Sequence, residues 1–204
     1  MFLPFTIRSK LISTSKNGSL GANCRVFQIR TGTPDPDSWK DVFLRISECC
    51  LATLTAQIIQ YDDDSRRLEQ QRLIPGWNYC QYFLIKEAMV FTYEIAGLFE
   101  EALMQYDELE ASFFQTMIEQ GVPWFKKFGS SEPLDDSRDI LDYATNTYRE
   151  QIIQNSITIF GFRLYLFSRQ CQLLLALKQP DQILIRGKRF ITSFSQTLLE
   201  YTSV

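Results

Sequence analysis

The feature that most constrains the fold of this chain is a pair of apolar segments separated by one glycine. The first, from about Trp77 to Ala96, is apolar on almost every side, whereas the second, from about Leu98 to Gln120, carries one apolar stripe at helical spacing. A helix that is apolar all round is covered on more than one side, and Gly97 permits a tight turn. The sequence therefore predicts an antiparallel helical hairpin inside a larger helical assembly.

Helical spacing recurs on both sides of this hairpin. Upstream, Ser38-x-x-Asp41 resembles a capping box and opens a helix that Pro75-Gly76 ends. Downstream, the pattern predicts a long loop, a moderately helical stretch, a strongly apolar helix and a last amphipathic helix, over residues 121–137, 139–154, 162–178 and 182–201. We therefore expect a mainly α fold of antiparallel helical hairpins over residues 38–204.

Residues 1–37 differ in composition from the rest of the chain. A loop rich in Ser, Asn and Gly precedes Cys24–Arg30, whose alternation of apolar and polar residues predicts one short strand. A single strand is not stable alone, so either its partner lies outside this chain or the strand is lost. We expect residues 1–37 to form an N-terminal loop and strand remnant, separate from residues 38–204.

The absence of histidine argues against most enzyme classes. A chain without His lacks the commonest general base, the commonest metal ligand and the usual nucleophile triads. The glycines of Thr31-Gly-Thr33 and Gly129-Ser-Ser131 lack the spacing and the Lys of a phosphate loop. The carboxylates of Asp62–Asp64 fall on a solvated helix face. The sequence therefore predicts a protein that is not an enzyme, with no catalytic, cofactor-binding or metal-binding residues and no cofactor.

Cysteine usage and hydropathy favour a cytoplasmic protein. The five cysteines are odd in number and irregular in spacing, which argues against a disulfide framework and predicts reduced, buried thiols. We expect no segment with the roughly 18 apolar residues that a membrane-spanning helix needs. The net charge of −3 lacks the basic footprint of a nucleic-acid-binding protein.

Charge is distributed unevenly along the chain. From Leu84 to Gln120 there are eight acidic residues and one Lys, whereas from Gly161 to Phe190 there are six basic residues and one Asp. Such a split suits complementary surfaces in an assembly, and ordinary solvated helix faces are the alternative. The acidic side of the hairpin is the candidate docking surface, formed by Glu100, Glu101, Glu108 and Glu110.

A half-repeat of the tetratricopeptide type spans the glycine turn. Ala88, Tyr93, Gly97, Ala102 and Tyr106 stand at the spacing of that repeat, in which small residues let the two helices approach and aromatic residues fill the gaps between them. The match supports a tetratricopeptide-like α-solenoid segment. An unrelated helical bundle is the alternative that this half-repeat alone leaves open.

Several blocks in order resemble one family more specifically. They are Cys24–Arg30, Asp37–Trp39, Pro75–Cys80, Phe83–Ala88, Leu103–Ala111 and Phe162–Cys171. Together these blocks resemble the trafficking protein particle (TRAPP) complex subunit 10 family, the large subunits specific to TRAPP II. The resemblance covers roughly residues 24–195, and it is carried most specifically by Tyr-Asp-Glu-Leu and Tyr-Leu-Phe-Ser-Arg-Gln-Cys in register.

The resemblance implies a function that composition does not give. It implies a non-catalytic scaffold subunit of a multisubunit complex that tethers vesicles and promotes nucleotide exchange on a Rab GTPase at the Golgi. Its partners would be other TRAPP subunits and, indirectly, a Rab GTPase, with no nucleic acid. It also implies a cytoplasmic location, peripheral to Golgi membranes through the complex. Because family members are several times longer, we expect this chain to be a fragment of the N-terminal half.

The residues that carry the motifs are expected to act by packing. They are Pro75, Gly76, Trp77, Gly97, Ala102, Tyr106, Leu109, Tyr165, Leu166 and Arg169. The first three shape a corner between helices, and the others lie in or beside helix contacts. The alternative function is a peptide-binding helical-repeat adaptor outside trafficking, which would need a concave groove with basic residues.

Overall fold

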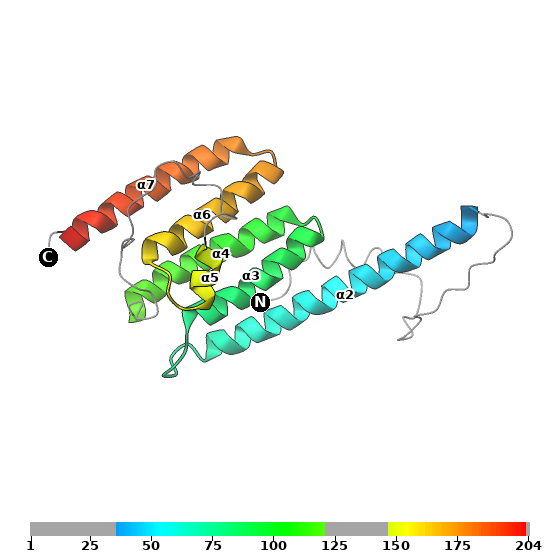
Figure 1. The fold of residues 1–204 in the computed structure, drawn as a ribbon, viewed down its shortest axis with the longest axis horizontal. Helices are drawn as coiled ribbons and strands as arrows, with labels where there is room; N and C mark the ends of the chain where they lie inside the picture. The colour runs from blue at the N-terminus through cyan, green and yellow to red at the C-terminus, as the bar shows by residue number, and fades with distance from the viewer. Residues whose placement is uncertain (1–35, 121–146, 203–204) are drawn as a thin grey trace. The chain divides into compact units, whose positions relative to one another are not determined.

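The computed structural model describes residues 36–120 and 147–202, and within these ranges every regular element is an α-helix (Figure 1). The expected mainly α class is therefore confirmed for the described part of the chain. The expected strand Cys24–Arg30, the expected loop 121–137 and the first part of the expected helix 139–154 lie outside the described residues.

The chain divides into two compact units, Met1–Gln60 and Tyr61–Val204, and the division falls inside helix α2 (Pro36–Gln70). The expected division after residue 37 stays a prediction. Helix α2 ends before the predicted stop at Pro75 because the hydrogen-bond pattern changes after Gln70. The N–H groups of Gln71 and Arg72 donate to carbonyls three residues back, as in a turn, and not four residues back as in an α-helix.

Helix α2 corrects the expectation about membrane-spanning segments. Between Trp39 and Gln70 an 18-residue window reaches a mean hydropathy of 1.5 and is 6% buried. By length and composition this helix is therefore apolar enough to cross a bilayer. Core helices of soluble proteins pass the same test, so the finding assigns no span. Cys49 and Cys50 on this helix are exposed, whereas Cys80 and Cys171 in the second unit are buried as expected.

The second unit contains the predicted hairpin, formed by α3 (Tyr79–Ile95) and α4 (Phe99–Gln120). Gly97 has a φ of +71°. At this turn the N–H of Gly97 donates to the carbonyl of Glu94, and the N–H of Leu98 donates to that of Tyr93. This pair of bonds is the Schellman motif, which favours glycine at its left-handed position.

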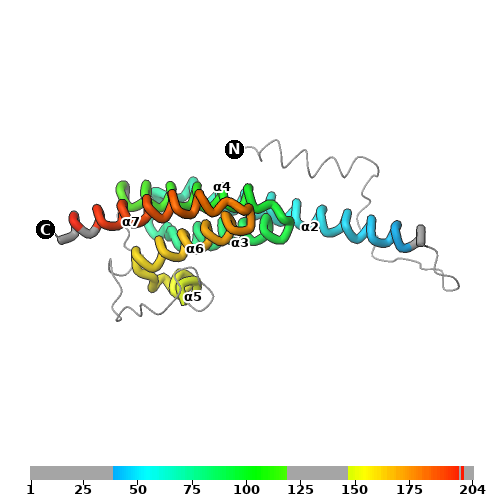
Figure 2. Tube along the Cα trace, turned by 90° about the horizontal axis from the view of Figure 1, so that it is seen from above, coloured from blue at the N-terminus to red at the C-terminus, as the bar shows by residue number. Residues whose placement is uncertain are grey.

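The rest of the second unit comprises α5 (Tyr148–Ile153), α6 (Ile159–Ala176) and α7 (Pro180–Thr202). Helix α6 packs on both α4 and α7, and α5 packs on α3 and α6. In Figure 1, α3, α4, α6 and α7 alternate in direction, and in Figure 2, α4 and α7 lie toward one side and α6 and α5 toward the other. Helix α6 is therefore the element that joins the first hairpin to α7.

Aromatic rings fill the junction of α3, α4 and α6. Phe162 of α6 contacts Tyr79 at 5.8 Å, Phe83 at 5.0 Å and Phe113 at 4.7 Å between ring centroids, and all four residues are fully buried. Each such contact stabilises the junction beyond the apolar area that it buries. The three helices therefore share one core.

Candidate docking site

The structure separates the four carboxylates that the sequence proposes as a docking surface. Glu100 is exposed, whereas Glu101 is only 8% exposed. Glu108 lies near α3, where its Oε2 is 3.6 Å from Nζ of Lys86. Glu110 lies on the side of α6, and its Oε2 accepts a bond from Nε2 of Gln170 at 3.0 Å. The four residues do not share one face of α4, and their docking role stays a prediction.

Residues near Glu110 link α4 to α6 and α7. The Nε2 group of Gln170 also donates to Oδ1 of Asp107 at 2.9 Å. Arg186 of α7 forms a bidentate pair with Asp107, in which Nη2 donates to Oδ2 at 2.8 Å. Two-point pairing of this kind fixes orientation as well as charge. One carboxylate of α4 therefore holds a buried amide of α6 and a guanidinium of α7.

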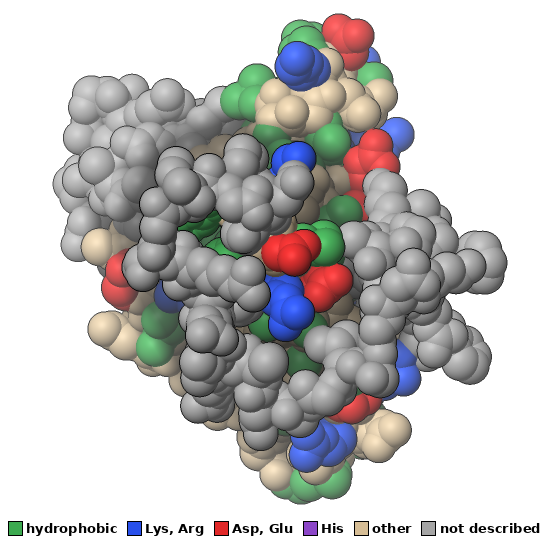
Figure 3. All heavy atoms as spheres, turned by 90° about the vertical axis from the view of Figure 1, so that its right-hand side faces the viewer, with side chains coloured by type: hydrophobic (Ala, Val, Ile, Leu, Met, Phe, Trp, Pro, Cys, Tyr) green, Lys and Arg blue, Asp and Glu red, His purple; other side chains and the backbone are tan. Residues whose placement is uncertain are grey.

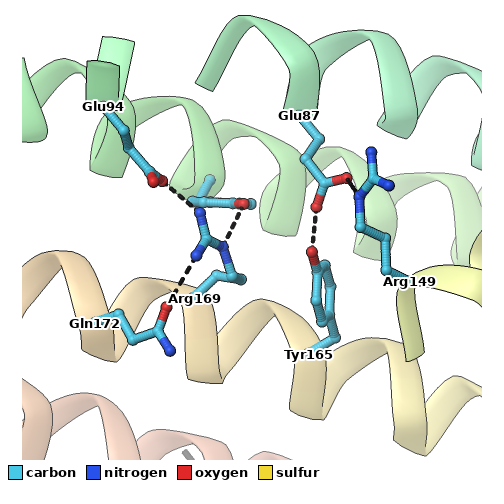
Figure 4. A network of polar contacts seen from close by, with 7 residues as sticks. Glu87, Glu94, Arg149, Tyr165, Arg169 and Gln172 are labelled. Atoms are coloured by element: carbon cyan, nitrogen blue, oxygen red, sulfur yellow. Dashed lines mark hydrogen bonds and ion pairs between the residues drawn. The ribbon is translucent and has the colours of Figure 1, made fainter. Parts of the chain in front are cut away.

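The centre of the second unit holds a buried carboxylate that the sequence analysis did not single out. Glu87 of α3 is fully buried, accepting from the hydroxyl of Tyr165 on one oxygen and from Nε of Arg149 on the other, at 2.9 Å (Figure 4). Burial raises the pKa of Glu87, and the bonds from Tyr165 and Arg149 oppose that rise. The available signal was a Glu in the middle of a helix that is apolar on almost every side.

A second buried group extends this network along α6. Arg169 is 3% exposed and uses all three of its nitrogens: Nε donates to the hydroxyl of Tyr106 at 2.9 Å, Nη1 to Gln172 at 2.9 Å and Nη2 to Glu94 at 2.5 Å (Figure 4). Its guanidinium also lies over the ring of Phe91, 5.1 Å from the centroid. A buried charge with this many partners fixes how α6 sits on the first hairpin.

The motif residues that the sequence analysis names lie in the core or at turns. Ala102, Tyr106, Leu109, Tyr165 and Leu166 are all buried. The corner before α3 is closed by Trp77, whose Nε1 donates to the carbonyl of Leu68 at 2.7 Å, and by Gly76 at a φ of +95°. The structure thus gives these residues structural positions, while their docking role, like that of the carboxylates, stays untested.

This arrangement offers little for catalysis in the described residues. No group of three or more Cys, Asp or Glu there is placed to hold a metal ion. Both oxygens of Glu87, the most deeply buried carboxylate, are occupied by donors from the chain itself. Where side chains are coloured in Figure 3, acidic and basic groups are interspersed with hydrophobic ones.

Comparison with known proteins gives the family. No protein-family model matches the chain, and no solved structure matches it at a significant level. Among curated proteins, the trafficking protein particle complex II-specific subunit 130 homolog of Arabidopsis thaliana is 36% identical over 171 residues, which are 84% of this chain and 13% of the relative. Trafficking protein particle complex subunit 10 of Homo sapiens is 32% identical over 166 residues, 79% of this chain and 13% of the relative. The chain is homologous to subunit 10 of the TRAPP complex.

Relatives from a plant and an animal thus confirm the family resemblance inferred from the motifs. A third relative, subunit 10 of Dictyostelium discoideum, is 32% identical over 81% of this chain. The chain spans about an eighth of the length of these relatives. The structure brings three of the motif blocks together: Phe83–Ala88, Leu103–Ala111 and Phe162–Cys171. Glu87, Tyr106, Tyr165 and Arg169 all come from these blocks, and they meet where α3, α4 and α6 pack together.

Proposed function

We propose that this chain is a non-catalytic scaffold segment of a multisubunit complex that tethers vesicles and promotes guanine-nucleotide exchange on a Rab GTPase in Golgi trafficking. The observation that carries the proposal is its identity of 32–36% with TRAPP subunits over about four fifths of its length. A scaffold needs rigid surfaces and no reactive groups. The full occupancy of Glu87 and Arg169 by partners within the chain agrees with that requirement.

The architecture proposed for this scaffold is a tetratricopeptide-like α-solenoid segment. Two pairs of helices, α3 with α4 and α6 with α7, are each closed by a Schellman turn, at Gly97 and at Lys178. Helix α6 of the second pair packs against α4 of the first. Stacking of successive hairpins in this way is how solenoids extend a surface for partners.

The proposed partners are other TRAPP subunits and, indirectly, a Rab GTPase, and the proposed location is cytoplasmic, peripheral to Golgi membranes. Affinity capture of the tagged chain from cell extract, with bound proteins identified by mass, tests this directly. We expect the small subunits of the TRAPP core among the captured proteins. A chain that is helical by circular dichroism yet captures none of them would overturn the docking proposal for this segment.

A charge-reversal pair makes the same experiment specific for the acidic side of the hairpin. Glu100→Lys changes an exposed carboxylate at the start of α4, and Asp181→Lys makes the same charge change at an exposed position in α7. If α4 docks a subunit through its carboxylates, Glu100→Lys reduces the captured amount and Asp181→Lys leaves it unchanged. Equal capture by both variants would remove Glu100 from the docking surface.

A further inference from the structure

The candidate for a second surface is a groove between α4 and α7. It has a volume of about 360 Å³, and side chains of α6 also line it. One half-buried aromatic ring from each helix lines it: Phe114 from α4, Phe167 from α6 and Phe190 from α7. The rings of Phe167 and Phe190 are stacked, with centroids 5.0 Å apart. The groove therefore offers aromatic faces that an apolar or planar group can cover.

The charged groups of the groove are not all neutralised. Asp107 is paired with Arg186. Among the described residues Glu110 accepts only from Gln170, so that one of its oxygens has no donor there. Arg189 also lines the groove; it is exposed and forms no ion pair within the described residues. One cation and one hydrogen-bond acceptor at the rim of the groove are thus available to a ligand.

A third arginine lies beneath the surface of the groove. Arg163 of α6 is 5% exposed, and it stacks on Phe114, Phe190 and Phe194 with its guanidinium carbon 5.0–5.4 Å from the ring centroids. Its one hydrogen bond goes from Nη2 to the hydroxyl of Ser193, which itself lines the groove.

Within the described residues, Nε and Nη1 of Arg163 have no acceptor, and no carboxylate lies within ion-pair distance of this side chain. Burial lowers the pKa of Arg163, and the negative charge of Glu110, which forms no ion pair with it, opposes that shift in part. Buried charges in proteins are normally paired, so an unpaired one beside a groove indicates that its counter-charge comes from elsewhere.

From these observations we propose that the groove binds an acidic peptide segment of a partner subunit. Around the groove, the guanidinium groups of Arg163, Arg186 and Arg189 outnumber the carboxylates of Asp107 and Glu110, which leaves a surplus positive charge. A carboxylate of the segment pairs with Arg189 and approaches Arg163 at Ser193, while an apolar side chain covers the phenylalanine rings. A backbone N–H of the segment donates to the free oxygen of Glu110.

A peptide fits these features better than a free anion or a lipid headgroup. A lone phosphate would leave the aromatic rings uncovered and would offer no N–H donor to the free oxygen of Glu110. An extended segment supplies a carboxylate, an apolar side chain and a backbone donor together. This inference rests on the proposed scaffold function, because it assigns one of the surfaces by which the chain would hold a partner subunit.

The test uses the purified chain and an array of short overlapping peptides that cover the other TRAPP subunits. Each acidic peptide is paired with a copy in which Asp and Glu are replaced by Asn and Gln. We expect the chain to bind peptides in which an acidic residue adjoins apolar ones, and to bind their amide copies at least about tenfold more weakly. Inorganic phosphate and vesicles of anionic lipid serve as the competing probes.

Two neighbouring residues of α7 supply matched variants. Arg189→Glu and Lys188→Glu make the same charge change at exposed positions, but only Arg189 lines the groove. We expect Arg189→Glu to weaken peptide binding by at least about tenfold and Lys188→Glu by less than about twofold. Circular dichroism of both variants confirms that each is folded.

Each of several results would overturn the proposal: no bound peptide, equal binding of the amide copies, equal weakening by both variants, or competition by phosphate or vesicles as strong as that by peptide. Capture of TRAPP core subunits from extract by the Arg189→Glu chain at the unchanged level would also reject the groove as the docking surface, while leaving the scaffold function standing. If the chain without substitutions captures no TRAPP core subunit but still binds peptides, the scaffold proposal alone is rejected.

Discussion

The two faces of α6 differ in whether their buried charged side chains are paired. Toward α3 and α4, Arg169 has a partner for each of its nitrogens and Glu87 has a donor for each of its oxygens. Toward α7 and the end of α4, Arg163 has one hydroxyl and three aromatic rings but no ion pair within the described residues. On the first face the buried charges have partners within the chain, whereas on the second face a buried charge lacks an ion-pair partner among the described residues. In this unit, the paired buried charges hold helices together, whereas the unpaired one indicates a candidate binding surface.

The largest effect is expected from removing one aromatic ring on each face of α6. Phe162→Ala deletes a fully buried ring that contacts three others, and we expect it to lower the free energy of unfolding by about 3–5 kcal/mol. Phe167→Ala deletes a half-buried ring at the groove and should cost no more than about half of that. Urea unfolding of the two variants measures both, and equal losses would contradict the distinction between the faces.

A smaller effect is expected at the turns that close the two helix pairs. Both turns have Schellman geometry, with Gly97 at a φ of +71° in one and Lys178 at +58° in the other. Gly97→Ala adds a Cβ where nothing lies within 4 Å, so its cost of about 1 kcal/mol is conformational. Lys178→Gly relieves the same strain and should raise the melting temperature. A lower melting temperature for Lys178→Gly would show that this turn is held by contacts of the lysine.

The smallest effect is a pH dependence from Glu87. Because burial raises the folded-state pKa of Glu87 above its unfolded value, the folded state binds this proton more tightly. The contribution of Glu87 to stability is therefore fully present below the unfolded pKa, and part of it is lost as the pH rises through the folded pKa. We expect the stability of the unchanged chain, relative to Glu87→Gln, to fall as the pH rises from about 4 to 7. Urea unfolding at several pH values measures this, and a constant difference would contradict the raised pKa.

The helix positions were predictable from the sequence, but their ends depended on local caps. Helix α3 begins at Tyr79, two residues after the expected Trp77, because the side chain of Asn78 accepts from the N–H of Cys80. Helix α6 begins at Ile159, before the expected Phe162, because Thr158 caps the N–H of Gly161. Helical spacing identifies a face but does not show which nearby polar side chain ends the helix.

The charge partners were not predictable from the sequence. Glu87 and Tyr165 are far apart in the chain, and periodicity places each on a buried face without pairing them. The acidic composition of α4 predicts one surface, yet Glu108 lies near α3 and Glu110 lies near α6. Arg163 looks like Arg169 in sequence, since both lie on the same apolar helix. Only the packing of α4 and α7 around α6 distinguishes the paired arginine from the unpaired one.

The most direct test compares these two arginines. Arg169→Met leaves Glu94 and the hydroxyl of Tyr106 without their donor, and it should lower the free energy of unfolding by about 2–3 kcal/mol. Arg163→Met removes an unpaired cation and keeps contact with three rings, so it should change stability by less than about 1 kcal/mol while abolishing peptide binding. If Arg163→Met destabilises the chain as much as Arg169→Met, or leaves peptide binding intact, then Arg163 is a structural residue and the two faces of α6 do not differ as inferred.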